Sequence, residues 1–446
     1  MQSINTSPLA ARAVRKGGYG FHYFPDEQHY RIADLERWLP ELQALGAAWL
    51  TLRASAERAV PEAFINALVQ AGIEPIIHIP HSGVEPFDLE DLASLAAAYR
   101  NWGVNYVVLY DQPNQREQWP AGTFDQLHLI ERFLTCWLPA VKVLRACGLA
   151  AVFPPLRQGG TFWDLSFLRT SIETLTAWGE TELMHEMILG AYAFAGPHPA
   201  DWGRGGQTAW PAAQPYCTPP GSEDQLGFRA FEWYAEVTAE CLGQPLPTLV
   251  LAGGARFGEL DTKTGQPLDI AWHTTCNANI AHAMTNRHLP DYLLNMNFWL
   301  LAAEGQPAAA AAAAWFPAGS QPLPVCQQLS TPVGSAALAS NANKPGAAKR
   351  LPHYVLLPTL EHGPSEWHWR AAGGFVRDQH AACGYSAEDA AAALQVTVVG
   401  SEQEISRQVE TGLRGIGCKV RRVAGADFGQ LTANLAANAI PVPATL

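Results

Sequence analysis

The sequence is poor in charged residues and has neither a long apolar run nor a basic stretch. Charged residues make up 16% of the 446 positions, and 29 Lys and Arg stand against 41 Asp and Glu, for a net charge of -12. No apolar run approaches the ~20 residues that cross a bilayer, so we expect no membrane-spanning helix. The acidic balance argues against nucleic acid and anionic membrane surfaces as partners.

Several signatures of catalysis and targeting are also missing. The eight cysteines are scattered without a CxxC pair or zinc-finger spacing, which favours free thiols over disulfides. There is no strong Gly-rich phosphate loop and no GxSxG elbow, so we expect no nucleotide or other cofactor. Residues 1–17 lack the apolar segment of a secretion signal, which predicts a soluble, cytoplasmic protein, with association with the cell envelope left open.

What the sequence does contain is a regular alternation of short apolar runs with longer segments of helical period. This pattern is typical of a parallel sheet wrapped by helices, and eight such units in about 320 residues predict an α/β fold of the TIM (β/α)8 barrel type. The expected strands are Tyr19–Phe24, Trp49–Arg53, Pro75–Ile79, Asn105–Tyr110, Leu149–Phe153, Met187–Ala193, Thr248–Gly253 and Asn295–Leu300. The expected helices are 29–45, 57–71, 88–102, 123–147, 164–178, 226–242, 268–286 and 305–315.

The chain divides into four segments. Residues 1–17 form an N-terminal tail, and residues 18–321 form the barrel, with an insertion at 194–225 after the sixth strand. Residues 322–350 are rich in Ala, Ser, Pro and Gly and predict a linker. Residues 351–446 then predict a small α/β domain of flavodoxin-like type with three strands, at 354–357, 395–399 and 419–423.

Candidate site residues are those that follow the barrel strands, because a TIM barrel builds its active site at the carboxyl ends of its strands. Acid, amide, imidazole and guanidinium groups alternate there with tryptophan, a mixture that can hydrogen-bond sugar hydroxyls and stack on sugar rings. We therefore expect a carbohydrate ligand, either an oligosaccharide or a polysaccharide. The predicted ligand-binding residues are His22, Asp26, Arg53, His78, Asn114, His198, Asp201, Trp202, Arg256 and Trp299.

Two strand ends carry a resemblance to a known group of enzymes. The fourth strand reads VVLYDQPN and resembles the Asn-Glu-Pro-Asn motif of the retaining glycoside hydrolases of clan A. The seventh reads PTLVLAGG and resembles their Thr-Glu-Gly-Gly motif. The resemblance spans residues 18–316 and implies a (β/α)8 barrel in which the strand-four Glu is the acid/base and the strand-seven Glu the nucleophile. Gln112 and Ala252 occupy those two positions here.

This substitution predicts a glycoside-hydrolase-like barrel that binds carbohydrate but lacks the usual hydrolysis, which needs two carboxyl groups ~5–5.5 Å apart. An alternative is an active glycoside hydrolase that uses a non-standard carboxylate such as Asp111. A second alternative is a non-catalytic scaffold whose mouth is filled by the insertion. His22, His78, His81 and Asp111 could in principle hold a divalent metal, but the expected His-x-His pair is absent, so we predict no metal site.

Residues 395–437 carry a separate resemblance. The strand end Val399-Gly400 and the run Arg422-Val423-Ala424-Gly425-Ala426-Asp427 are similar to one cell-wall-binding repeat of the second type. The resemblance implies cell-wall polymers as a ligand of this part of the chain. Phe428 replaces the Arg-Tyr pair usual in the repeat, and the alternative is a plain βαβ scaffold.

Overall fold

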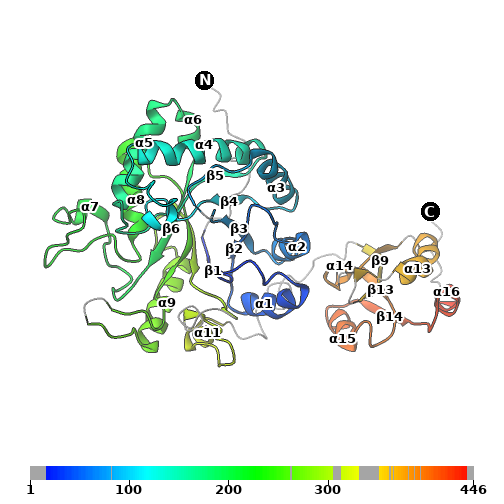
Figure 1. Cartoon of the computed structure of the whole chain (residues 1–446). Helices are drawn as coiled ribbons and strands as arrows, with labels where there is room; N and C mark the ends of the chain where they lie inside the picture. Colours follow the sequence, from blue (N-terminus) through cyan, green and yellow to red (C-terminus); the bar gives the residue numbers. More distant parts are fainter. Residues whose placement is uncertain are drawn as a thin grey trace, which may run out of the picture. The chain divides into compact units, whose positions relative to one another are not determined.

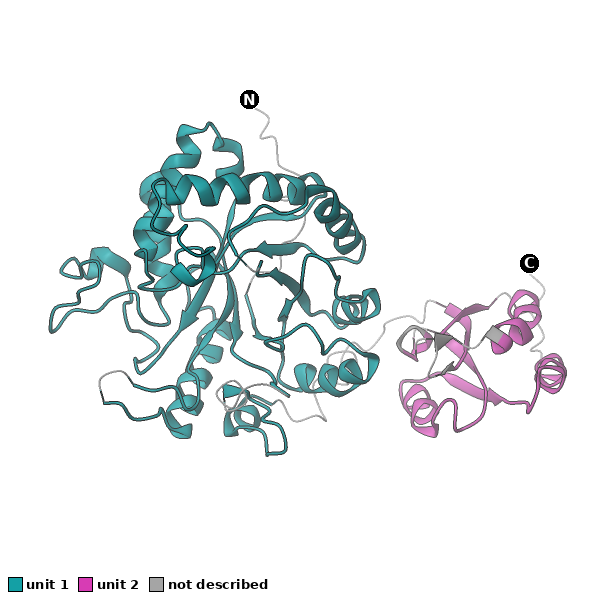
Figure 2. Cartoon of the chain, in the orientation of Figure 1, with its two compact units in different colours: residues 1–333 teal, residues 334–446 magenta. Residues whose placement is uncertain are grey.

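The computed structural model describes residues 17–438 except for 82, 262–263, 305–312, 331–350, 361–362, 365, 380, 386 and 392. The chain forms two compact units, Met1–Val333 and Gly334–Leu446 (Figure 2). Nearly all of the expected tail, most of the expected linker and most of the expected helix at 305–315 lie outside the described residues.

The first unit is built on eight parallel strands that close into a barrel in chain order (Figure 1). This confirms the predicted α/β barrel. Each strand lies within two residues of its expected start, because apolar runs bounded by glycine stops mark buried parallel strands well. The strands are β1 Tyr19–His22, β2 Trp49–Arg53, β3 Glu74–Ile79, β4 Tyr106–Leu109, β5 Ala150–Phe153, β6 Ile188–Phe194, β7 Thr248–Gly254 and β8 Leu293–Phe298.

The strands bury both faces. Along β4, Tyr106 and Val108 belong to the cluster that fills the barrel interior, whereas Val107 and Leu109 pack outward against the helices. Successive side chains of a strand point to opposite faces, so this alternation sorts the whole core into two layers. The inward-facing side chains nearest the carboxyl end of each strand therefore lie at the open end of the barrel.

The helices cover the outside of the barrel through their apolar stripes. In α4, Phe133, Trp137 and Leu144 are fully buried at helical spacing. The helices of this unit are α1 Ile32–Ala44, α2 Glu62–Gln70, α3 Leu89–Asn101, α4 Leu129–Ala146, α5 Asp164–Ala177, α6 Thr181–Glu186, α7 Gly206–Ala209, α8 Ala230–Leu242, α9 Ile270–Thr285 and α11 Pro324–Leu329, with a 3-10 turn at Arg116–Gln118.

Helix α11 lies inside the segment that we expected to be a linker. Leu323, Val325 and Cys326 are buried in the barrel unit's core, and α11 packs on α9. The barrel unit therefore extends past residue 321, because these three apolar residues precede the Ser- and Ala-rich stretch.

A hydrogen-bonded side chain accommodates an irregularity between β7 and β8. The register of this strand pair shifts after Thr248, and Asn295 bonds both backbone groups of Val250, accepting from its N–H at 2.9 Å and donating to its carbonyl at 3.1 Å. Further along, Asn297 donates to the Thr51 hydroxyl at 2.7 Å, which donates to the Leu251 carbonyl. Polar side chains thus replace ladder bonds where the strands lose register.

The second unit is a parallel sheet of four strands in the order β12-β9-β13-β14, not the three strands expected. The additional strand is β12, Ala382–Gly384, whose three small residues show no apolar run. The remaining strands are β9 Leu351–Leu356, β13 Ala393–Val399 and β14 Lys419–Val423, with a small pair β10 Thr359–Leu360 and β11 Gly363–Pro364. The helices are α13 Glu366–Asp378, α14 Ala387–Ala391, α15 Arg407–Gly415 and α16 Phe428–Ala437.

One arginine holds the loop that follows β13. The Arg422 guanidinium donates to the carbonyls of Gly400, Ser401 and Ile405 and is paired with the Glu410 carboxylate. This arginine belongs to the run that resembles the cell-wall-binding repeat, and the contacts give it a structural task within the unit.

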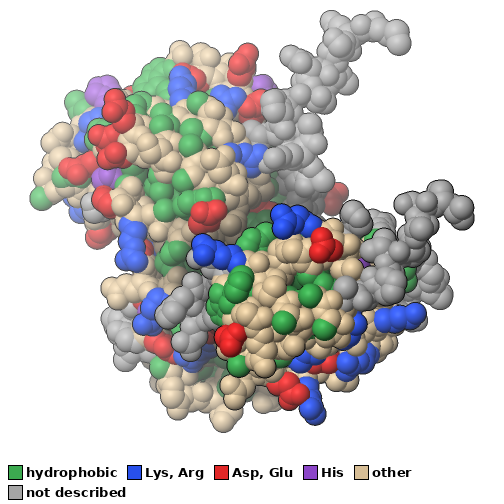
Figure 3. Space-filling model, turned by 90° about the vertical axis from the view of Figure 1, so that its right-hand side faces the viewer, with side chains coloured by type: hydrophobic (Ala, Val, Ile, Leu, Met, Phe, Trp, Pro, Cys, Tyr) green, Lys and Arg blue, Asp and Glu red, His purple; other side chains and the backbone are tan. Residues whose placement is uncertain are grey.

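Two observations concern the hydrophobicity and the charge of the described residues. None of the described helices is both long and apolar enough to span a membrane. On the face shown in Figure 3, acidic and basic side chains are scattered among uncharged ones.

A buried carboxylate ties α5 to α8 and to the end of the insertion. Asp164, at the first turn of α5, is fully buried and accepts from the Gly159 N–H, the Gln225 Nε2 and the Tyr234 hydroxyl at 2.8–3.1 Å. Burial raises the pKa of this carboxyl above its ordinary value, against the lowering effect of the three donors.

We expect Asp164→Ala to lower the free energy of unfolding by about 2–4 kcal/mol, because three buried donors lose their acceptor. Asp164→Asn keeps an acceptor and costs less. Since the folded-state pKa is raised, the contribution of the carboxyl declines as pH rises from the acid range to neutrality, so the Asn variant gains on the wild type over that interval. Urea unfolding at acid and neutral pH measures the free energy of unfolding of the wild type and both variants. If Asp164→Ala and Asp164→Asn lose the same free energy at every pH, both expectations are wrong.

Candidate functional site at the barrel mouth

The carboxyl ends of the strands gather polar side chains from distant parts of the sequence. His22 ends β1, Arg53 ends β2 and His78 lies near the end of β3, all in the inward parity of their strands. The charge of Arg53 acts on both histidines, and the charge of Asp111, just past β4, acts on His78. The structure therefore brings together four residues that the sequence analysis identified.

Asp111 lies in a tight turn and is held by a tyrosine. Tyr110 and Gln112, on either side of it, have positive φ angles of 66° and 45°, a conformation that costs energy for residues with a side chain. The Tyr192 hydroxyl donates to the Asp111 Oδ1 at 2.8 Å. Burial, and next the Asp111 charge, raise the pKa of Tyr192 well above its ordinary value, so the phenol stays protonated and keeps donating.

The two motif positions that resemble catalytic glutamates hold neutral groups next to this pair. The Gln112 side chain is close enough to the Tyr192 hydroxyl to lower the pKa of that phenol slightly, against the larger effect of burial. Ala252 is fully buried in the barrel's inner cluster, directly opposite Tyr192 in the pairing of β6 with β7. Asp111 is the only acid whose charge is felt by either His78 or Tyr192 among the residues that the structure describes.

His22 lies beneath an aromatic ring and keeps one unpaired nitrogen. Its ring centre is 4.7 Å from that of Trp299, which follows β8. The side chain is buried, and its Nδ1 has no hydrogen-bond partner in the described part of the chain. Burial, then the charges of His78 and Arg53, lower the pKa of His22 well below its ordinary value, so the imidazole is neutral.

His78 is also a neutral imidazole. Its ring nitrogen Nε2 lies 3.1 Å from the Tyr110 carbonyl. Burial lowers its pKa, although Asp111 and the backbone hydrogen bond act in the opposite direction. The site thus holds two uncharged histidines close to each other. Each neutral imidazole has one nitrogen that donates a hydrogen bond and one that accepts.

Arg53 opens onto a groove of about 430 Å³, which is within the range of about 300–1,000 Å³ typical of ligand pockets. The groove is lined by Pro25, Asp26, Glu27, Gln28, Arg53 and Arg58. Asp26 accepts from the Gln28 N–H and lies 2.8 Å from His29 Nδ1, so its carboxylate also shapes the loop after β1.

Aromatic rings extend the site toward β6 and β7. Phe194 ends β6, with its ring 5.8 Å from Tyr192 and 6.5 Å from Trp299. The Arg256 guanidinium lies 4.3 Å from the centre of the Phe194 ring and is paired with Glu259. The sequence analysis missed Tyr192 and Phe194, although the alternation Ala191-Tyr192-Ala193-Phe194 was the signal that puts both large rings on one face.

Asn114 has a structural role in the connection that follows β5. It is fully buried, donates to the carbonyls of Arg157 and Phe162 and accepts from the Arg157 N–H at 2.8 Å. An amide with these three bonds has little capacity left for a ligand.

The aromatic residues of the insertion contact each other, the end of the insertion and the connection before α5. The rings of His198 and Trp202 stack 4.0 Å apart, and the Trp202 indole donates to Asp224, while Asp201 is exposed to solvent. Tyr216 donates to the carbonyl of Thr161, in the connection between β5 and α5. None of these contacts reaches His22, Asp111 or Trp299.

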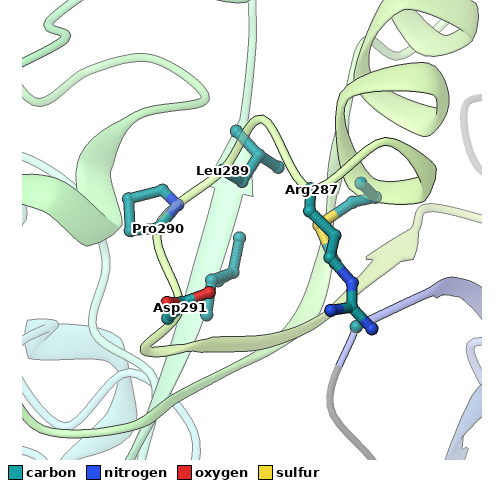
Figure 4. Close-up of a pocket in the computed structure, with 7 residues that line it drawn as sticks. Arg287, Leu289, Pro290 and Asp291 are labelled. Atoms are coloured by element: carbon teal, nitrogen blue, oxygen red, sulfur yellow. The ribbon is translucent and has the colours of Figure 1, made fainter.

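Two other features of the described residues bear on the site. They include no group of three His, Cys, Asp or Glu close enough to hold a metal ion. A cavity at the opposite end of the barrel is lined by residues from the connection between α9 and β8, including Arg287, Leu289, Pro290 and Asp291 (Figure 4). It lies at the amino ends of the strands, the end that serves stability in barrel enzymes.

Comparisons with known proteins find similarity in structure alone. No family model matches the chain, and no curated protein matches its sequence. A family 39 glycoside hydrolase from the gut symbiont Bacteroides cellulosilyticus WH2 is similar in structure, with 13% identity, coverage of 70% of this chain and 63% of that one, and a TM-score of 0.45. A β-glucuronidase from an uncultured Clostridium sp. matches with 12% identity, 70% and 50% coverage and a TM-score of 0.41.

A family 128 (subgroup II) endo-β-1,3-glucanase from Sorangium cellulosum matches with 11% identity, 71% and 97% coverage and a TM-score of 0.42. The chain spans less than two thirds of the length of the first two of these proteins. The neighbours are glycoside hydrolases, but at this level of similarity none assigns an activity to this chain.

The two buried histidines predict a pH dependence of stability. Their folded-state pKa values are lowered, so protons bind the unfolded chain more tightly. Their contribution is present above about pH 6.5 and is lost as pH falls through the folded-state pKa, with a slope of up to about 1.4 kcal/mol per pH unit for each histidine.

We expect His78→Gln to reduce this slope between about pH 7 and 5. The exposed His185 provides a matched control, and His185→Gln should leave the slope unchanged. Denaturant unfolding at a series of pH values measures the slope of the free energy of unfolding against pH. An identical slope in the wild type and in His78→Gln contradicts the prediction that the buried His78 is neutral.

Proposed function

We propose that the barrel mouth binds a carbohydrate and lacks hydrolysis by a pair of carboxylates. The observation that carries this proposal is the surroundings of Asp111: the carboxylate accepts from Tyr192, and the adjacent motif positions hold Gln112 and Ala252. Retaining hydrolysis needs a second carboxyl group at ~5–5.5 Å and inverting hydrolysis one at ~6.5–9.5 Å.

Other acids near the mouth are committed elsewhere. Glu259 is paired with Arg256, and Asp26 with His29 and the Gln28 N–H. These pairings orient both carboxylates within their own loops, which does not suit a group that must reach the oxygen between two sugars. Of these three acids, Asp111 is the one whose charge acts on His78, and its Oδ1 accepts from the Tyr192 hydroxyl, not from a second acid.

The composition of the mouth suits sugar recognition. The Trp299 ring offers a face for the C–H groups of a pyranose. The neutral imidazoles of His22 and His78, the Asp111 carboxylate and the Arg53 guanidinium offer acceptors and donors for hydroxyl groups. We further propose that the ligand is an oligo- or polysaccharide, with cell-wall polymers suggested by the resemblance in the second unit.

Hydrolysis is tested with aryl glycosides of both anomers. We expect no turnover above background from the wild type, from Asp111→Asn or from Gln112→Glu, because each lacks at least one of the two required carboxyl groups. Release of the chromogenic phenol measures turnover. Wild-type turnover that disappears in Asp111→Asn would show that the protein is a glycoside hydrolase with Asp111 as a catalytic group.

Binding is tested by calorimetry with hexasaccharides of β-1,3-glucan, β-1,4-glucan, xylan and chitin. We expect saturable binding of at least one of them, weakened about tenfold by Trp299→Ala, which removes the stacking ring. Trp178→Ala is the matched control, because Trp178 is exposed at the carboxyl end of α5, where the chain returns to the amino end of the next strand, away from the mouth. Absence of binding to all four sugars supports the scaffold alternative.

A further inference from the structure

The arginine at the end of β2 has no partner for its charge. The Arg53 guanidinium makes no hydrogen bond or ion pair with any residue that the structure describes, and none of its nitrogens is among the fully buried polar atoms without a partner. These nitrogens are therefore accessible at the mouth. The other described arginines of the barrel unit that are partly or fully buried all have partners, which are amide or carbonyl oxygens for Arg100 and Arg132 and glutamates for Arg145, Arg169, Arg229 and Arg256.

The groove onto which Arg53 opens contains a second arginine without a counter-charge. Arg58, in the connection after β2, is exposed, lines the groove and forms no ion pair with the described residues. The acids of the lining, Asp26 and Glu27, are not paired with either arginine in the described part of the chain, and Asp26 lies 2.8 Å from His29 Nδ1 instead. Both guanidinium groups are therefore available to an anion that enters the groove.

The lining of the groove suits a charged group better than a neutral sugar ring. Among the described residues, Pro25 is the one apolar side chain of the lining, and no aromatic ring contributes to it. A neutral pyranose binds largely by stacking on aromatic rings, and the ring that offers this at the mouth is Trp299. A planar carboxylate, in contrast, accepts two parallel hydrogen bonds from one guanidinium.

The groove lies within reach of a ligand that stacks on Trp299. Strand β1 pairs with β8 on one side and with β2 on the other. His22, which ends β1, therefore stands between Trp299, just past β8, and Arg53 at the end of β2. Neighbouring strands are about 4.8 Å apart, so two strand spacings amount to about 10 Å. Neighbouring units of one oligosaccharide can thus contact both Trp299 and Arg53.

We propose that the carbohydrate bound at the mouth is acidic, and that a sugar unit carrying a carboxylate occupies the groove, held by the guanidinium groups of Arg53 and Arg58. This inference rests on the function proposed above and names the ligand class of the same site. The chain as a whole has a net charge of -12, so the attraction is local to these two arginines. It favours a uronate unit at one place in the ligand over a long polyanion.

The test is titration calorimetry of the full chain with two matched pairs of hexasaccharides. One pair is β-1,4-glucan and β-1,4-glucuronan, and the other is xylan without and with one glucuronate side group. We expect the acidic member of at least one pair to bind about tenfold more tightly than its neutral counterpart, because hydrogen bonds between charged groups are stronger than those between neutral ones.

Variants of the groove separate charge from geometry. Arg53→Gln should abolish the preference for the acidic member and leave the affinity for the neutral one within about twofold. Arg53→Lys keeps the charge but loses the planar fork, so it should retain part of the preference. Arg58→Gln should reduce it about threefold, because Arg58 is exposed. Arg287→Gln is the matched control, since it removes a positive charge from an exposed arginine at the opposite end of the barrel (Figure 4).

The outcomes distinguish this inference from the proposed function. Equal binding of the acidic and neutral members in both pairs overturns the inference, as does a preference for the acid that survives Arg53→Gln combined with Arg58→Gln. In both cases, weaker binding of the neutral sugar by Trp299→Ala still supports the mouth as a carbohydrate site. Absence of binding by all four hexasaccharides contradicts a carbohydrate ligand and overturns both proposals.

Discussion

Closure of eight parallel strands into a barrel is the constraint on which the rest of the structure depends. Closure buries both faces of every strand, so inward and outward side chains form two separate cores. It also brings all eight carboxyl ends to one rim, whatever their separation in sequence. His22 and Trp299 stand at opposite ends of the barrel segment, yet their rings lie 4.7 Å apart because β1 pairs with β8.

Burial sets the chemistry of that rim. Desolvation keeps His22 and His78 neutral and Tyr192 protonated, so the site is rich in hydrogen-bonding groups but has few charges. The Asp111 Oδ1 accepts a hydrogen bond from the Tyr192 hydroxyl. Such a set of groups can bind a polyhydroxylated ring. Cleavage of the bond between two sugars requires in addition two carboxyl groups, one on each side of that bond.

The insertion at 194–225 packs as an additional layer on the outer helices of the barrel. Within it, the Trp202 indole donates to the Asp224 carboxylate, and from α8 the Trp233 indole donates to the Gly203 carbonyl. The contacts of α7 with α8 hold this layer on the outside of the barrel.

The sequence by itself determined the architecture: strand and helix periodicity and glycine stops are local signals, and they placed all eight barrel strands and most helices. It also predicted that His22, Arg53, His78, Asp111 and Trp299 lie at the carboxyl ends of the strands, because the end of an apolar run can be read from the sequence. It missed β12, whose residues Ala382–Gly384 have no apolar pattern, and α11, whose six residues precede a low-complexity stretch. Only the tertiary structure decided that Tyr192 bonds Asp111, that Asn114 holds a loop and that the insertion faces the outer helices, because these contacts depend on strand register and loop paths between residues far apart in the chain.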